Sequence, residues 1–235
     1  FLGSAGAMQT AGPSLMLTYF FAGIIMFYIM RALGEVAVEH PVSGSFSAHA
    51  TAFLGPKTGY LTGWTYWFMW VVTCMAEITA VGVYVHYWLP DIPQWIPALL
   101  ALLCMTLVNL IAVKIYGEFE FWFALIKVVT IVAMIIIGLA MILFGLGNNG
   151  IAIGFSNLWQ NGGFFPNGIS GTVMALVMVM FSYLGIELVG VTAGEAKNPK
   201  KTLPSAIDKV FFLFLFFYVL AMGVIMSLYP WNHIG

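Results

Sequence analysis

Residues 119–144 read FEFWFALIKVVTIVAMIIIGLAMILF, an apolar run that contains only two charged residues, Glu120 and Lys127. A helix of about 20 such residues crosses the hydrocarbon core of a bilayer, which is about 30 Å thick. The whole chain has this composition, because 62% of its residues are apolar and 7% are charged. Soluble domains carry about 25% charged residues. We therefore expect an all-α transmembrane helical bundle whose outer surface contacts lipid.

Six runs share this length and scarcity of charge. They cover residues 13–30, 59–88, 96–113, 119–144, 172–191 and 210–229. Residues 1–8 are typical of the end of an earlier span, and the chain does not open with Met. We therefore expect all 235 residues to form one partial transmembrane domain, a fragment of a longer protein.

The basic residues predict how the chain is oriented in the membrane. Seven of the eight Lys and Arg residues lie in or beside alternate loops, whereas segments 1–12, 89–95, 145–171 and 230–235 contain none. Cytoplasmic loops of membrane proteins carry an excess of Lys and Arg. We therefore predict that the loops with Lys57, Lys114 and Lys197–Lys201 are cytoplasmic. The net charge of −1 gives no indication of a nucleic-acid partner.

Apart from Glu120, at the second position of its run, three charged residues lie inside the apolar runs, where charge is costly and often functional. They are Glu77, Lys127 and Glu187. A membrane-embedded lysine or carboxylate is typical of a proton or cation site. We expect Glu77 to face the protein interior, to be protonated or to pair with a base. Two structural alternatives stay open. Lys127 can extend toward Glu118 or phospholipid, and each carboxylate can satisfy backbone groups at an irregular helix.

The fifth run contains an unusual combination of residues at its midpoint. Residues 181–185 read FSYLG, which places hydroxyl groups beside a helix-weakening glycine. Transporters bind substrates near the bilayer midplane at discontinuous helices, whose free N–H and C=O groups suit a zwitterion. Glycine is also common in ordinary membrane helices. The residues alone therefore fit either a broken helix or a plain span.

One short motif suggests a different class of protein. Residues 168–171 read GISG, which matches the Gly-x-Ser-Gly pattern of intramembrane serine proteases. The motif falls at the outer edge of a run, and no His lies within a later run to act as a base for Ser170. No metal-binding or nucleotide-binding pattern occurs in the sequence either. We expect a protein that is not an enzyme, without catalytic residues, metal or cofactor.

Four longer stretches resemble the bacterial amino acid transporter branch of the amino acid–polyamine–organocation superfamily. They are MRALGE at 30–35, GYLTGWTYW at 59–67, GEFEFWF at 117–123 and TAGEAKNP at 192–199. The resemblance covers essentially the whole chain. It implies a multi-pass protein of the bacterial cytoplasmic (inner) membrane that imports an amino acid such as proline, histidine, γ-aminobutyrate, D-alanine or an aromatic amino acid.

The resemblance also implies a fold of two inverted five-helix halves with two further helices. This chain would hold the outer end of helix 1 and helices 2–7. The glycine-rich break of helix 1 would lie just before Phe1, and the remaining helices would complete the site.

Residue by residue, the resemblance assigns roles to the groups singled out above. It implies that the unwound part of helix 6 binds the substrate, with carbonyls for the amino group and an aromatic side chain as a lid. The matching residues are Phe181, Ser182, Tyr183, Leu184 and Gly185. Glu187 matches an acid implicated in gating, and Glu77 has an acidic counterpart whose role is the least defined. Lys127 matches a lysine that replaces the sodium ion of sodium-coupled relatives. This implies proton symport, and a sodium-coupled or exchange transporter is the alternative. Which amino acid is carried does not follow from these stretches.

Overall fold

The computed structural model describes residues 3–40, 42, 45–111, 113–191 and 199–233. These ranges form helices joined by turns and loops and contain no strand, which confirms the all-α prediction. The chain divides into two compact units, each described here by itself. The first takes in the chain up to Ser45 and from Val129 onward, and the second runs from Phe46 to Val128.

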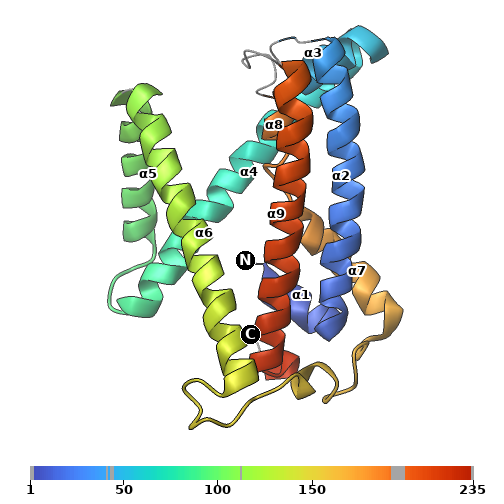
Figure 1. The fold of residues 1–235 in the computed structure, drawn as a ribbon. Coiled ribbons are helices and arrows are strands. Elements are labelled where there is room, and N and C mark those ends of the chain that lie inside the picture. Colours follow the sequence, from blue (N-terminus) through green and yellow to red (C-terminus); the bar gives the residue numbers. More distant parts are fainter. Residues whose placement is uncertain (1–2, 41, 43–44, 112, 192–198, 234–235) are drawn as a thin grey trace. The chain divides into compact units, whose positions relative to one another are not determined.

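Two long helices form the centre of the first unit. Helix α2 (Leu15–Glu39) and helix α9 (Pro199–Leu228) run side by side along much of their lengths (Figure 1). Small residues on α2 permit this approach, since a Cβ atom at Gly34 would overlap Ile207 of α9. Near the same end, the Arg31 guanidinium lies 3.7 Å from a carboxylate oxygen of Asp208.

Two shorter helices pack against this pair. Helix α1 (Ser4–Ala11) and helix α7 (Gly168–Ser182) contact each other and α2. A 3-10 turn, Gly12–Ser14, joins α1 to α2, with Gly12 at a φ of +63°. The Asn167 side-chain amide donates to the carbonyls of Gln9 and Thr10, both at 3.0 Å. These bonds fix the start of α7 to the end of α1.

Three of the segments without Lys or Arg meet at one end of the first unit. The Trp231 indole N–H donates to the carbonyl of Asn161 at 3.1 Å, and the Asn157 amide donates to the carbonyl of Ser227 at 2.8 Å. Segments 1–12 and 145–171 are joined there by the bonds of Asn167. If the loops with and without Lys and Arg alternate between the two sides of the membrane as predicted, these three segments must lie at the same end of the helices. Its assignment to the outer side of the membrane stays a prediction.

Helix α6 (Val113–Phe144) contributes its second half to the first unit. Ile135 and Ile142 of α6 are buried against Ala221 and Val224 of α9. A Cβ atom at Gly138 would overlap Val224, so the two helices approach closely at this glycine. This half of the predicted fourth run therefore has a buried side and an exposed apolar side that is compatible with lipid.

The second unit is built on helix α4 (Pro56–Trp88), which packs against helix α5 (Trp95–Ile111). Helix α3 (Ser45–Leu54) precedes α4 and was not among the predicted elements. Gly55, with a φ of +95°, turns the chain between α3 and α4. The Ser47 hydroxyl then donates to the carbonyl of Gly59 at 2.9 Å, which joins the two helices.

Replacing Gly59 by valine is expected to lower the melting temperature of the detergent-purified protein. A Cβ atom at this position would overlap the Thr51 hydroxyl and lie 2.9 Å from the Ser47 carbonyl oxygen. Overpacking of this kind costs about 1–3 kcal/mol. Gly3→Val is the control, because a Cβ atom there meets nothing within 4 Å. An unchanged melting temperature for Gly59→Val would show that α3 does not pack on α4 as described.

The chain is that of an integral membrane protein. By length and composition, four stretches of the described chain can cross a membrane: Ser4–Glu39, Pro56–Trp88, Phe121–Phe144 and Thr202–Leu228. The other two predicted runs correspond to shorter apolar helices. Helix α5 has 17 residues, and the run at 172–191 is divided because α7 ends at Ser182. Lys197 lies outside the described residues, as do the side chains of Lys114, Lys200 and Lys201.

Candidate substrate-binding site at a broken helix

The predicted fifth run is interrupted at its middle. Helix α7 ends at Ser182, residues 183–187 are in turns, and the single-turn helix α8 (Leu188–Val191) follows. We call residues 183–187 the helix break. Gly185 has a φ of +98°, which takes the chain out of the helical path. An L-amino acid with a side chain rarely adopts this conformation, so the local structure depends on glycine.

Backbone hydrogen bonds change their pattern through the helix break. The N–H groups of Tyr183, Leu184 and Ile186 each donate to the carbonyl three residues earlier, at 3.2, 3.2 and 3.3 Å. The carbonyls of Ser182 and Gly185 accept from the Tyr218 hydroxyl and the Leu188 N–H. Within the part of the chain that the structure describes, the Leu184 carbonyl accepts no hydrogen bond. It is therefore the open acceptor of this stretch.

Glu187 closes the helix break with its side chain. Its Oε2 atom accepts the N–H of Gly185 at 2.7 Å, which satisfies a donor that has left the helical ladder. Its Oε1 atom is buried and has no hydrogen-bond partner among the described residues. The sequence left a structural and a coupling role open for this carboxylate. The structural role is observed, and the coupling role stays a prediction.

The aromatic side chains of the helix break face different surroundings. Phe181, on the last turn of α7, has 68% of its surface exposed, whereas Tyr183 is fully buried. Of these two predicted substrate-binding residues, only Phe181 therefore presents its side chain at the surface of the described chain. The Tyr183 side chain fills the space between α2 and α9, the two helices that pack beside the helix break.

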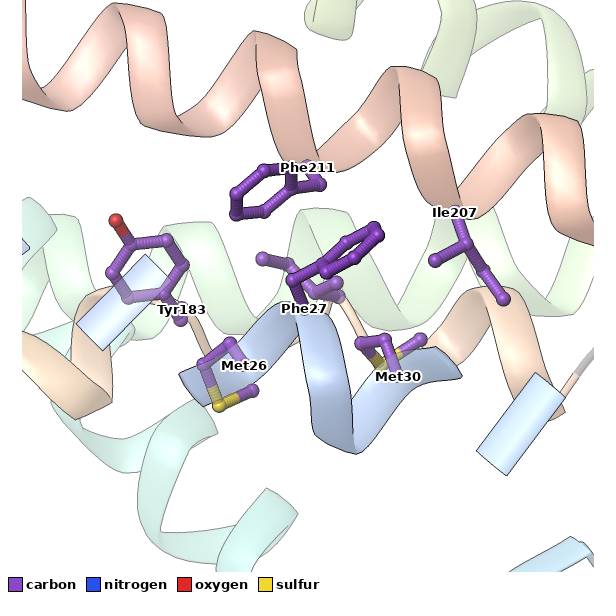
Figure 2. A pocket seen from close by; sticks show the side chains of 7 residues that line it. Met26, Phe27, Met30, Tyr183, Ile207 and Phe211 are labelled. Carbon is purple, nitrogen blue, oxygen red and sulfur yellow. The ribbon is translucent and has the colours of Figure 1, made fainter. Parts of the chain in front are cut away.

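A small cavity lies on the Tyr183 side of the helix break. Its volume is about 10 Å³. Figure 2 shows Tyr183 presenting its ring to this cavity, with its hydroxyl directed away from Met30. The lining is apolar: Met26, Phe27, Met30, Tyr183, Ile186, Ile207 and Phe211. A space of this size holds at most about one water molecule. This cavity is therefore too small to hold an amino acid.

Two tyrosines that the sequence did not single out contact the helix break. Tyr19 of α2 and Tyr218 of α9 both bond to Ser182, through its side chain and its carbonyl respectively. No sequence signal identified them, because both lie inside apolar runs where a tyrosine is an ordinary core residue.

Lys127 and Glu77 belong to the second unit, and both side chains are exposed. Neither forms an ion pair with a described residue. The three alternatives for Glu77, an interior position, a bound proton or a basic partner, stay predictions. Ala80 and Gly82 of α4 are buried, and a Cβ atom at Gly82 would lie 2.8 Å from the Gln94 carbonyl oxygen.

Two further features of the sequence, possible metal ligands and Ser170, can be located among the described residues. No group of three His, Cys, Asp or Glu side chains in these ranges is placed to hold a metal ion. The Ser170 hydroxyl is exposed at the start of α7 and donates to the carbonyl of Asn167 at 3.3 Å. It acts there as a local bond in the first turn of the helix.

The whole chain, residues 1–235, matches the family model described as amino acid permease. It is 64% identical over 235 residues to an uncharacterized amino acid permease, YtnA, of Bacillus subtilis. It is 50% identical over 235 residues to a probable threonine/serine transporter, YbxG, of the same organism. It is 49% identical over 234 residues to the aromatic amino acid transport protein AroP of Escherichia coli. Each alignment covers 100% of this chain and 51% of the relative, so the chain spans about half the length of these proteins. No solved structure matches the chain.

Proposed function

Because this chain belongs to the amino acid permease family, we propose that it forms part of a secondary active transporter that imports an amino acid across the bacterial cytoplasmic membrane. The observation that supports this most directly is the helix break at residues 183–187, in the middle of an apolar helical run. Two relatives are named for threonine/serine and for aromatic amino acids. Since these substrates differ widely in size and polarity, the names do not select one substrate for this protein.

The substrate is a zwitterion, and its ammonium group needs acceptors. An ammonium group carries three donors, and carbonyl oxygens at a broken helix are suitable partners. In our proposal the Leu184 carbonyl is the first of these, because it is the one carbonyl of residues 181–185 without a bond from the described chain. Phe181, exposed beside it, closes over the ligand. The remaining walls, including the carboxylate site, come from the rest of the full-length permease.

Coupling to protons is the second part of the proposal. Glu187 supports it, because the buried Oε1 atom has no partner in the described chain and an unpaired buried polar atom is costly. A proton or a donor group at Oε1 lowers this cost. Lys127 supports it through its place in α6, with apolar residues on both sides of it in the sequence. Glu77 is the third candidate for this role. Sodium coupling or exchange is the alternative.

We expect a proton gradient to drive uptake by the full-length permease in proteoliposomes. A pH jump, acid outside, should cause accumulation of the labelled amino acid without any sodium gradient. A panel of unlabelled amino acids in the same assay identifies the substrate by competition. Accumulation driven by sodium and indifferent to pH would contradict proton coupling, and it would leave amino acid transport standing.

Replacing Lys127 by alanine is expected to lower proton-driven accumulation by at least about tenfold, which corresponds to about 1.4 kcal/mol. Exchange of labelled for unlabelled substrate should change much less, because exchange does not require net proton movement. Lys209→Ala is the matched control, since Lys209 is an exposed lysine on α9 and the change removes the same charge. Equal accumulation by Lys127→Ala and Lys209→Ala would contradict a coupling role for Lys127.

A further inference from the structure

Three tyrosines enclose the end of α7. Tyr19 comes from α2, Tyr183 from the helix break and Tyr218 from α9. The rings of Tyr19 and Tyr218 are stacked, with centroids 4.9 Å apart and an interplanar angle of 12°. The Tyr183 ring lies 5.5 Å from that of Tyr218. Tyr19 and Tyr183 are buried, and Tyr218 is partly buried. We call these three residues the tyrosine cluster.

The tyrosine cluster holds both oxygen atoms of Ser182. The Tyr218 hydroxyl donates to the Ser182 carbonyl at 2.7 Å. The Tyr19 hydroxyl lies 3.2 Å from the Ser182 hydroxyl and 3.4 Å from that of Ser4. The Tyr183 hydroxyl donates to the carbonyl of Tyr19 at 2.7 Å. The last residue of α7 and the first residue of the helix break are therefore tied by directional bonds, Ser182 to α2 and α9 and Tyr183 to α2.

These bonds satisfy a requirement of the broken helix. The last carbonyls of any helix have no partner within it, and a buried acceptor left unpaired is costly. The bond between Tyr218 and Ser182 has the ordinary length of a strong O–H···O bond. Gly23 leaves room for the second bond, from the Tyr183 hydroxyl to the Tyr19 carbonyl. A Cβ atom at Gly23 would lie 3.0 Å from the Tyr183 hydroxyl and 3.0 Å from Leu215.

We propose that Tyr218 is a positioning residue for substrate binding, an inference that rests on the proposed function. By occupying the Ser182 carbonyl, Tyr218 fixes the end of α7 against α9. The neighbouring groups on the chain, the Leu184 carbonyl and the Phe181 side chain, take their positions from this fixed point. Tyr218 itself touches no substrate, because its hydroxyl bonds to the backbone on the buried side of the helix break.

The decisive variant is Tyr218→Phe in the full-length permease. It keeps the stacked ring and removes the donor to Ser182. We expect the KM of uptake to rise about five- to tenfold, the factor associated with a lost hydrogen bond. The Vmax per folded transporter should stay within about twofold, because transition between the two faces is not affected directly. Tyr229→Phe is the control, since Tyr229 follows α9 and its side chain is exposed.

A second measurement follows the position of the helix break without using transport. Leu184→Cys is introduced after Cys74 and Cys104, both exposed, have been replaced by serine. The rate at which a small maleimide labels the introduced thiol is then measured in detergent. We expect Tyr218→Phe to raise this rate at least about threefold, because a helix break that has lost one tie opens more often.

The outcomes separate this inference from the proposed function. A KM within about twofold of that of the wild type would overturn the positioning role, whatever the effect on Vmax or on melting temperature. If the wild-type permease transports no amino acid, the proposed function fails, and the labelling rate alone decides whether Tyr218 holds the helix break. If Tyr218→Phe does not fold, Tyr19→Phe removes the other hydroxyl that bonds to Ser182, and the same two criteria apply to it.

Discussion

Replacing Gly185 by valine is expected to abolish amino acid uptake while the protein still inserts into the membrane. Gly185 has a φ of +98°, and a β-branched residue in that conformation is a rare outlier. Holding such a residue there costs about 1–3 kcal/mol. The chain relieves this cost by moving φ to negative values, which displaces the Gly185 N–H from the Glu187 carboxylate. The helix break then loses the geometry in which Leu184 presents its carbonyl.

The cause of this effect is conformational, since a Cβ atom at Gly185 would meet nothing within 4 Å. Gly147→Val is therefore the matched control. Gly147 has a φ of +74° in the loop after α6, and a Cβ atom there also meets nothing within 4 Å. Both variants are compared by uptake per amount of protein in the membrane. Normal uptake by Gly185→Val would count against the helix break as the binding site. Loss of uptake in both variants would show that the effect is not local to it.

Replacing Glu187 by leucine is expected to reduce uptake to background, whereas replacement by glutamine should separate the two roles of this side chain. Leucine removes the acceptor of the Gly185 N–H, and an unpaired buried donor costs about 1–3 kcal/mol. Glutamine retains an acceptor oxygen at that bond and cannot ionise. We expect Glu187→Gln to exchange substrate within about threefold of the wild type, because the helix break is retained. Proton-driven accumulation should be lost.

Glu35→Gln is the matched control for the loss of a carboxylate. Glu35 is an exposed residue of α2, and its carboxylate lies 3.7 Å from Arg31 at the cytoplasmic end predicted for that helix. Exposed ion pairs contribute roughly 0–1 kcal/mol, so this change should leave both assays unaltered. Accumulation by Glu187→Gln at the wild-type level would contradict the coupling role. Wild-type exchange by Glu187→Leu would contradict the bond to Gly185 as a structural requirement.

The sequence predicted the helices because they depend on local properties, and it left the helix break as one of two interpretations of residues 181–185. The run that includes Lys127 is apolar over more than the thickness of a bilayer, and it forms the helical residues of α6. Gly185 supplied the signal for the break, since glycine is the residue that most readily leaves a helical path. Glu187, two residues later, was identified as a charge in an apolar run, and its bond to the backbone is one of the two roles foreseen for it.

Contacts between helices could not be predicted in the same way. A helix that is apolar on all sides gives no periodic signal for the side that faces its neighbours. The exposure of Glu77 and the burial of Tyr183 both depend on which side of a helix is covered. Tyr19 and Tyr218 are separated from Ser182 by 163 and 36 positions in the chain, so their bonds with it depend on how α2, α7 and α9 pack. Helix α3 was missed because Ser45–Leu54 is short and lies between two apolar runs.

The bonds of Asn167 have a mechanical consequence for the first unit. The Asn167 amide donates to the carbonyls of Gln9 and Thr10 near the end of α1. Gly171 packs closely against the same place, since a Cβ atom on it would lie 2.5 Å from the Thr10 carbonyl oxygen. Helices α1 and α7 are thus coupled at one end. We therefore expect a displacement of this end of α7 to displace the end of α1 as well. The other end of α7 is held separately, because Ser182 bonds to Tyr19 of α2 and to Tyr218 of α9.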